Sequence, residues 1–309
     1  MDSKLTFTSP SETSTLTMSP QNDSTVPALH HQEHHMVLIV IYTLVLLIGT
    51  TSLSLTILIM KSRAASATSI AVLNLIFAHF VFLLSVPFRI YYHAAQNWSL
   101  GFGLCKVVSS MIHIHMYMSF SFYVVILITR LLAFYRKAEV VASPPRIYAL
   151  AASVVIWILV FVFVTCIIYF SYGKSNDDSS DGSFQCFNFG KSIGTTAKVI
   201  NYIISALIIT VALALTGLQA NVLWLLYRKH HQRCTSQQDF GAQLKSLCFA
   251  IIMVVCFIPY HLFRLYYLEH LELQGLNEVL LSLTTFNCLD MLTLLGRRTC
   301  SWCFPGTGI

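Results

Sequence analysis

Histidine has the widest chemical range of the side chains in this sequence, because imidazole binds metals and transfers protons near neutral pH. The 309-residue chain contains 12 histidines. One run, His31-Gln-Glu-His34-His35, fits the metal-binding box of membrane desaturases, but those enzymes need several boxes and only this one occurs. His113 and His115 are two residues apart, so on a helix they point to nearly opposite sides and share no metal. We expect no enzyme, no cofactor and no resident metal, although the N-terminal histidines could bind zinc weakly.

A second group of side chains is basic and would suit an anion. Arginine grips a carboxylate or phosphate with two parallel hydrogen bonds, and His261 and Arg264, three residues apart, share a helical face. The predicted ligand is therefore a small anion, such as a nucleotide or an acidic lipid. The alternative is that the basic side chains only snorkel to lipid headgroups. The predicted site consists of Arg89, His113, Lys198, His261 and Arg264, with Tyr117 and Tyr266 as aromatic walls.

The apolar composition determines which elements must carry these side chains. Hydrophobic residues make up 56% of the chain and charged residues only 10%, against about 25% charged in soluble domains. A helix needs about 20 apolar residues to cross a bilayer, and seven continuous stretches qualify. We expect an all-α, seven-transmembrane helix bundle rather than a soluble protein or a β-barrel. The predicted spans are Met36–Met60, Ala67–Tyr92, Leu104–Tyr135, Ile147–Ser171, Thr196–Tyr227, Leu244–Leu268 and Val279–Leu295.

The charged residues between these spans indicate the orientation. The segments on one side of the predicted membrane carry eleven basic and two acidic residues, and those on the other side carry seven basic and ten acidic residues. Positive residues stay in the cytoplasm, so the N-terminus is predicted to be extracellular. The net charge of +6 is therefore explained by basic residues on the cytoplasmic side of the membrane. Binding to nucleic acid is not needed to explain it.

The chain accordingly divides into three parts. Residues 1–35 are rich in Ser and Thr and are predicted to be a disordered extracellular tail, in which Asn22 begins a glycosylation sequon. Residues 36–295 form the seven-transmembrane domain, and residues 296–309 form a short cytoplasmic tail.

Several short motifs occur in an order that resembles the rhodopsin-like (class A) G-protein-coupled receptors. Cys105 and Arg130 are 25 residues apart, or about 37 Å along one helix, so they mark the two surfaces of the third span. The run from Phe257 to Arg264 is similar to the purinergic- and lipid-type branch. The remaining motifs are Asn74-Leu75, Pro87, Trp98-Ser-Leu-Gly101, Trp157, Cys256-Phe-Ile-Pro259 and Asn287-Cys-Leu-Asp290.

This resemblance implies a multi-pass receptor of the plasma membrane that passes an extracellular signal to a heterotrimeric G-protein. Ligand binding would shift the population toward a state with an open cytoplasmic cleft, with Arg130 at its centre and Phe257 and Pro259 at the hinge of the sixth span. Cys105 and Cys186 lie at the outer face, where an oxidising exterior favours a disulfide between them. Two free thiols are the alternative.

The sequence departs from the family pattern at residues that normally restrain the inactive state. Thr129 replaces the acid that usually neutralises the neighbouring arginine, here Arg130, and a charge within a membrane costs about 2.5–3.5 kcal/mol on insertion scales. We therefore expect a weaker restraint on Arg130 and raised basal signalling. The alternative is that Arg130 snorkels to the cytoplasm.

A second departure concerns the sodium site of the family. His79 stands where the second span usually carries an aspartate, and imidazole is a poor ligand for sodium. We expect His79 to pair with Asp290 in a proton-dependent way, near Ser119, and signalling to be insensitive to sodium. The alternative is a neutral core histidine without a switching role.

Other classes of membrane protein fit less well. No lysine lies between Val279 and Leu295, so an opsin chromophore would have no attachment point. The sequence shows no inverted repeats or paired broken helices of the kind that transporters use. A receptor-like scaffold with constitutive or lost G-protein coupling is the main alternative, because so many motifs are altered.

Overall fold

The structure is a computed structural model that describes residues 25–60, 67–136, 146–172, 186–187, 193–230 and 237–295. The predicted sequon at Asn22 and the predicted cytoplasmic tail, residues 296–309, lie outside the described residues. Every regular element among the described residues is helical. In chain order these are α1 Thr25–Met60, α2 Ala67–Ala95, α3 Phe102–Arg136, α4 Arg146–Tyr172, α5 Thr195–His230, α6 Gln237–Tyr267, η1 Leu271–Leu273, α7 Gln274–Leu283, η2 Thr284–Leu289 and α8 Asp290–Leu295.

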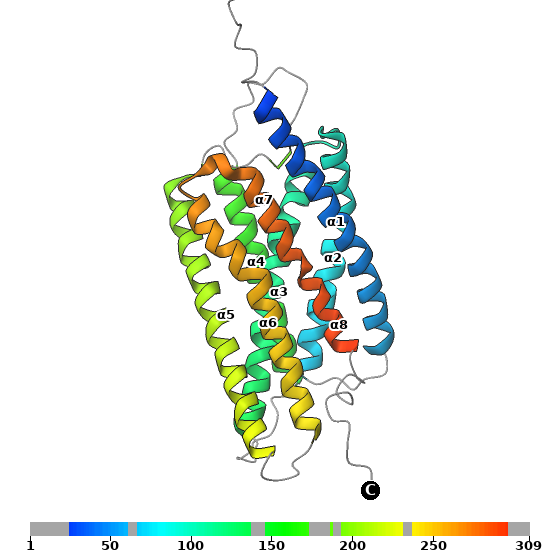
Figure 1. The fold of residues 1–309 in the computed structure, drawn as a ribbon, viewed down its shortest axis with the longest axis vertical. Coiled ribbons are helices and arrows are strands. Elements are labelled where there is room, and N and C mark those ends of the chain that lie inside the picture. The colour runs from blue at the N-terminus through cyan, green and yellow to red at the C-terminus, as the bar shows by residue number, and fades with distance from the viewer. Residues whose placement is uncertain are drawn as a thin grey trace, which may run out of the picture.

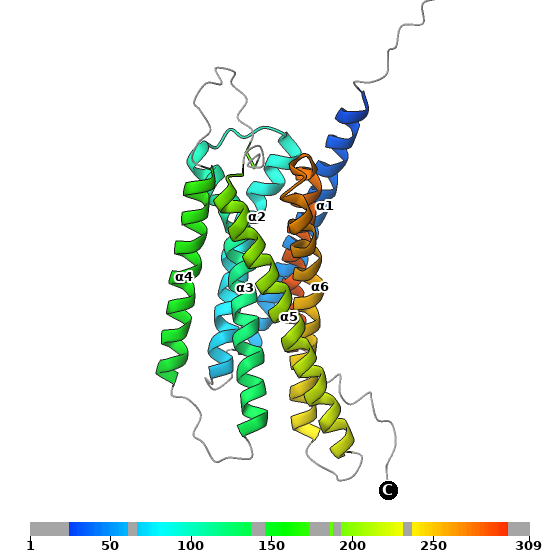
Figure 2. The same ribbon diagram turned by 90° about the vertical axis from the view of Figure 1, so that its left-hand side faces the viewer.

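The helices form one elongated bundle, which confirms the predicted fold class (Figure 1). Six of the described helices are long and apolar enough to cross a membrane by themselves. The seventh crossing is made of α7, η2 and α8, which follow one another down the bundle beside α1 and α6. Turned by 90°, the bundle shows α4 at one edge (Figure 2), where many of its apolar side chains are exposed.

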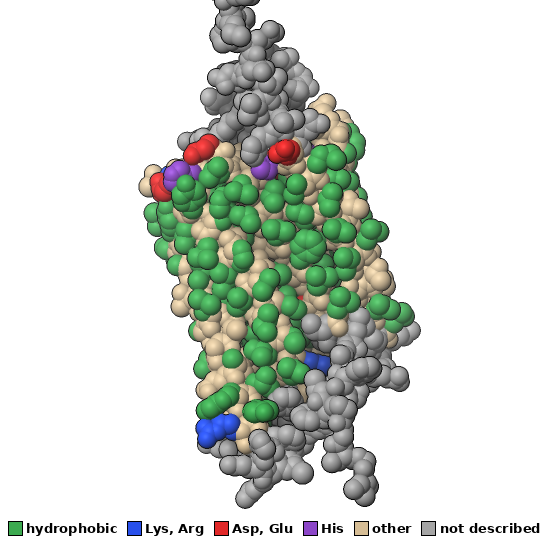
Figure 3. All heavy atoms as spheres, in the orientation of Figure 1, with side chains coloured by type: hydrophobic (Ala, Val, Ile, Leu, Met, Phe, Trp, Pro, Cys, Tyr) green, Lys and Arg blue, Asp and Glu red, His purple; other side chains and the backbone are tan. Residues whose placement is uncertain are grey.

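Surface chemistry agrees with a membrane environment. Figure 3 shows hydrophobic side chains over most of the height of one face, with charged side chains gathered mainly at its two ends. Because hydrocarbon offers no hydrogen bonds, the backbone must satisfy its own polar groups. Serine and threonine side chains within the spans also form hydrogen bonds inside their own helix. The Thr56 hydroxyl donates to the carbonyl of Ser52 at 2.8 Å, and that of Thr216 donates to the carbonyl of Ala212 at 2.7 Å.

The helices that carry the first and last spans begin earlier than the predicted spans. α1 begins at Thr25 rather than Met36, and the predicted end of the tail, residue 35, therefore lies inside this helix. Pro27 is compatible with this start because proline is tolerated in a first helical turn. Tertiary contacts also support the extension: the His34 ring packs beside Gly275 of α7. α7 likewise begins at Gln274, before the predicted Val279.

The seventh crossing is not a continuous α-helix. Between α7 and α8, residues Thr284–Leu289 form a 3₁₀ segment. The hydroxyls of Thr284 and Thr285 donate to carbonyls three residues earlier, at 2.6 Å and 2.5 Å, which suits the tighter winding of a 3₁₀ turn. This segment leads directly into Asp290, the first residue of α8.

The predicted disulfide is present and joins the top of α3 to the segment 186–187, with Cα atoms 5.8 Å apart. Around it lies a small apolar cluster that includes Tyr92, Trp98 and Phe187. The Trp98 indole donates to the carbonyl of Gly101 at 2.8 Å, and Gly101 has φ +84°, a conformation that favours glycine. The bridge therefore fixes Phe187 over the outer ends of α2 and α3.

Replacing Cys186 by Ser should destabilise the protein. The bridge closes a sequence separation of 81 residues, and loss of a native disulfide costs about 2–4 kcal/mol. Thermal unfolding of the purified, detergent-solubilised protein would measure the effect. Cys105→Ser should lower the midpoint equally, and Cys166→Ser, which removes an exposed free thiol, should leave it unchanged. Equal midpoints for wild type and Cys186→Ser would contradict the prediction.

Candidate functional site

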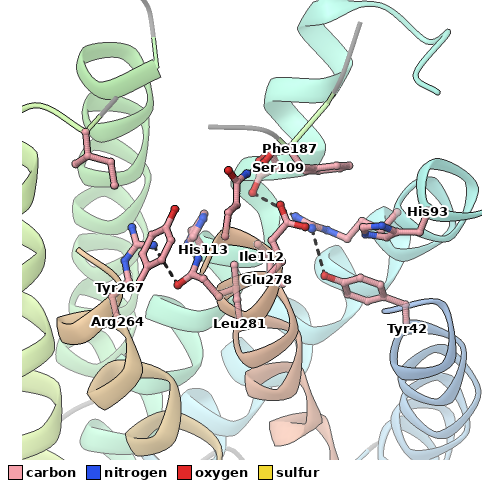
Figure 4. Close-up of a pocket in the computed structure, with 14 residues that line it drawn as sticks. Tyr42, His93, Ser109, Ile112, His113, Phe187, Arg264, Tyr267, Glu278 and Leu281 are labelled. Carbon is pink, nitrogen blue, oxygen red and sulfur yellow. Dashed lines mark hydrogen bonds between the residues drawn. The ribbon is translucent and has the colours of Figure 1, made fainter. Parts of the chain in front are cut away.

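A cavity of about 60 Å³ opens inside the outer half of the bundle. Its walls come from α1, α2, α3, α6 and α7 and from segments 186–187 and 193–194. Figure 4 shows that side chains from widely separated helices converge on it. Three predicted site residues, Arg89, His113 and Arg264, line this cavity together.

Arg89 is held deep in the bundle, with 4% of its surface exposed. Its guanidinium donates to the Tyr42 hydroxyl at 3.3 Å and to the carbonyls of Val108 and Ser109 at 2.8 Å and 3.3 Å. The same group lies 4.8 Å from the centre of the Phe187 ring, a cation–π distance. Arg89 therefore points inward and does not snorkel to headgroups.

Arg264 also points inward and is 7% exposed. Its guanidinium donates to the side-chain oxygens of Asn201 at 3.3 and 3.4 Å and of Asn277 at 3.3 Å, and it lies 5.1 Å from the Tyr267 ring. These bonds to neutral amides are longer than the 2.7–2.9 Å typical of charge-assisted pairs. A carboxylate or phosphate in the cavity could therefore compete for this guanidinium.

The other predicted ligand residues lie elsewhere. Lys198 forms an ion pair with Glu269 at 3.5 Å, and His261 contacts the Ser205 hydroxyl at 3.2 Å. Tyr117 packs against Phe163 of α4, with ring centroids 5.7 Å apart. Tyr266 stacks on His270 with ring centroids 4.1 Å apart. None of these four predicted residues lines the cavity described here, because each faces a partner on a neighbouring element or turn.

The Lys198–Glu269 pair is a surface contact at the extracellular end. A hydrogen bond from the Tyr202 hydroxyl, at 2.6 Å, is the main cause that lowers the pKa of Glu269, and the charge of Lys198 adds to it. Both partners are partly solvated, and such pairs contribute little to stability. This arrangement removes Lys198 from the charges available to a ligand.

Sequence reasoning missed an acidic group in the cavity. Glu278 of α7 lines the cavity (Figure 4), and Arg89 belongs to the same lining. Glu278 precedes the predicted start of the seventh span by one residue, so the charge count placed it in an extracellular loop. His93, one helical turn after Arg89, is a second missed residue of the lining.

Halfway down the bundle lies a buried polar centre built on Asp290, which is fully buried. His79 Nε2 is 3.4 Å from Asp290 Oδ1, so the predicted contact between these side chains is present. Tyr123 donates to Asp290 Oδ2 at 2.5 Å, and His79 Nδ1 lies 2.8 Å from His115 Nε2. The predicted neighbour Ser119 is also fully buried.

Tyr123 and His115 were not predicted as members of this centre. A signal existed, because His115, Ser119 and Tyr123 follow one another at spacings of four and share a face of α3. The carboxylate of Asp290 is thus contacted by the imidazole of His79 and the phenol of Tyr123. Phe257, predicted at the hinge of the sixth span, is fully buried with its ring 6.1 Å from that of Tyr123, and Pro259 lies within α6.

At the cytoplasmic end, Arg130 contacts the backbone of α6. Its Nη1 donates to the carbonyl of Ala242 at 3.2 Å. The Thr129 hydroxyl instead donates to carbonyls of its own helix, those of Val125 and Ile126, at 2.8 Å and 2.9 Å. Residue 129 thus carries no charge, and its hydroxyl is already hydrogen-bonded within α3.

Comparison with known proteins agrees with this arrangement. The family model described as "7 transmembrane receptor (rhodopsin family)" matches residues 50–292. Probable G-protein coupled receptor 141 of Homo sapiens is 39% identical over 265 residues, which cover 82% of this chain and 86% of the relative. Probable G-protein coupled receptor 34 of Pan troglodytes is 24% identical over 294 residues, 88% and 76% of the two chains. The 2-oxoglutarate receptor 1 of Rattus norvegicus is 24% identical over 234 residues, 74% and 68%.

Exchanging sodium for potassium at equal ionic strength should not change the thermal stability of the purified protein. Sodium needs oxygen ligands, and the buried centre presents two imidazoles beside Asp290. His79→Asp supplies a second carboxylate and should make the unfolding midpoint rise with sodium. His270→Asn, a histidine change in an extracellular segment, serves as the matched control. A sodium-dependent midpoint in the wild type would show the prediction to be wrong.

Proposed function

We propose, because this chain belongs to the rhodopsin family of seven-transmembrane receptors, that it senses a small extracellular ligand carrying an anionic group. As a member of this family it is a multi-pass protein of the plasma membrane and couples to G-proteins. The observation that supports the ligand class is the inward-facing guanidinium of Arg264, held by neutral amides beside His113 and a cavity.

The charges around the cavity favour Arg264 over Arg89 as the anion-binding group. Arg89 already has three hydrogen-bond acceptors and an aromatic face, and Glu278 acts on it electrostatically. Arg264 donates to the neutral amide oxygens of Asn201 and Asn277 at 3.3–3.4 Å, which an anion can replace as acceptors. We therefore assign the anion to Arg264, with His113 as a neighbouring hydrogen-bonding group in the same lining.

The size of the cavity bears on the kind of anion. A volume of about 60 Å³ corresponds to a few water-sized spaces, since one water needs about 10–15 Å³ by the same kind of measure. A carboxylate or phosphate group fits, whereas a whole lipid would have to leave its apolar part elsewhere. The relative named for 2-oxoglutarate makes small carboxylates the first compounds to test.

Binding at this level would act on the cytoplasmic end by population shift. Arg264 and Pro259 lie on the same helix, α6, whose inner part accepts the hydrogen bond from Arg130 at Ala242. A ligand that prefers a different position of α6 would disfavour that bond and open the cleft for a G-protein. Signalling would therefore depend on whether the position of α6 is set by the ligand at its outer end or by the hydrogen bond from Arg130 at its inner end.

The ligand class can be tested with G-protein activation in cells that express the receptor, using a panel of small carboxylates and phosphates that begins with 2-oxoglutarate. Arg264→Ala should reduce the potency of any responding anion by about 10–100-fold, because hydrogen bonds to charged groups contribute about 1.5–3 kcal/mol. Lys198→Ala, which removes an equal charge outside the cavity, is the matched control. Equal potency in the two variants at matched surface expression would refute the proposed site.

Basal coupling can be tested without a ligand. We expect measurable basal G-protein activation in the wild type, loss of it in Arg130→Ala, and a decrease in Thr129→Asp, because an adjacent carboxylate would hold Arg130 in the inactive arrangement. Thr129→Ser keeps the hydroxyl and should behave as the wild type. Unchanged basal activity in Thr129→Asp would contradict the weak-restraint hypothesis. No activity in the wild type or any variant would favour a scaffold that has lost coupling.

A further inference from the structure

Two histidines from different helices meet at the extracellular end of the bundle. His35 of α1 and His93 of α2 face each other through their Nδ1 atoms, 3.0 Å apart. The contact requires that at least one Nδ1 carries no proton, since two N–H groups would repel. It therefore places at least one imidazole lone pair at a junction between two histidines that are 58 residues apart in sequence.

The spacing of these nitrogens is close to that of two ligands on one metal ion. Zinc binds imidazole nitrogen at about 2.0–2.1 Å with tetrahedral angles, which places two such nitrogens about 3.3 Å apart. A separation of 3.0 Å needs only a slight opening of the pair. We propose that His35 and His93 form an extracellular binding site for zinc that joins α1 to α2.

The surroundings hold His93 in place for this role. Its ring stacks on that of Tyr42 at 5.9 Å with an interplanar angle of 13° and on that of Phe187 at 6.2 Å with an angle of 18°. Phe187 directly follows the disulfide-bonded Cys186, and its carbonyl accepts a hydrogen bond from Gln274 at 3.0 Å. A ligand whose orientation is already fixed loses little entropy when the metal binds.

The nearby charges nearly balance. Arg89, one turn before His93, opposes a cation, whereas Glu278 lines the same cavity and favours one. Among the residues that the structure describes, no group of three or more His, Cys, Asp or Glu side chains is arranged to hold a metal. Zinc would thus take two protein ligands and complete its coordination with water, and His93 borders the cavity from which such water can come.

The site has a direct mechanical consequence. The contact between the two imidazoles would be replaced by two metal–nitrogen bonds between α1 and α2, and the proton of the donating Nδ1 would move to Nε2 of its ring or to solvent. Because zinc would bind the folded pair and not the separated helices, it would stabilise the folded state in proportion to its concentration. The inference does not depend on the anion proposal, since neither His35 nor His93 is assigned to the anion.

The test is a zinc titration of the purified full-length receptor in detergent, prepared without a polyhistidine tag or chelator. ZnCl₂ should raise the thermal unfolding midpoint in a saturable way, and MgCl₂ should not, because magnesium prefers oxygen ligands. His35→Gln and His93→Asn should each weaken the apparent zinc affinity by at least about tenfold, since each removes one of two protein ligands. His35→Cys retains a zinc-binding side chain and should preserve the response.

Controls separate this site from other histidines. His270→Asn, outside the pair, should respond to zinc as the wild type does. The unfolding midpoint of each variant without zinc shows whether it is folded, and His35→Cys keeps the test decisive if His35→Gln is unstable. A zinc response that persists in the His35→Gln/His93→Asn double variant, or that is absent from the wild type, would overturn the proposal.

Discussion

The constraint on which this structure depends is the cost of an unpaired polar group in hydrocarbon. Backbone groups avoid this cost by forming the hydrogen bonds of helices. Polar side chains avoid it largely by pairing with groups on other helices. The Trp157 indole donates to Asn74 at 2.9 Å and so ties α4 to α2. Asp290 binds α2 and α3 through His79 and Tyr123. A few polar contacts therefore join α2, α3, α4 and α8 to one another within an apolar core.

α3 is the element along which these contacts are arranged. Its outer end carries the disulfide and His113, its middle supplies His115 and Tyr123 to the buried centre, and its inner end bears Arg130. The three regions therefore share one rigid helix, while α6 contacts each region with a different part of its length. Such an arrangement allows a change at the outer cavity to reach the cytoplasmic end through the packing of α6 on α3.

The buried centre shows how family landmarks can change while a polar network is maintained. With His79 in place of an acid, the carboxylate of Asp290 is paired with an imidazole and a phenol. The seventh crossing is interrupted by a 3₁₀ segment immediately before Asp290, in which the hydroxyls of Thr284 and Thr285 donate to carbonyls three residues earlier. Hydrogen-bonding side chains thus support both the buried carboxyl group and the 3₁₀ segment beside it.

The sequence by itself predicted the bundle and the approximate places of its spans and favoured the disulfide, because apolar length, charge asymmetry and the extracellular places of Cys105 and Cys186 can be read without knowing how the helices pack. It also indicated the contact between His79 and Asp290 through their places in family motifs. It did not reveal that Glu278 enters the cavity, that His35 meets His93, or that Lys198 and His261 face other partners. Those facts depend on how each helix is rotated about its axis, which only the packing of all the helices decides.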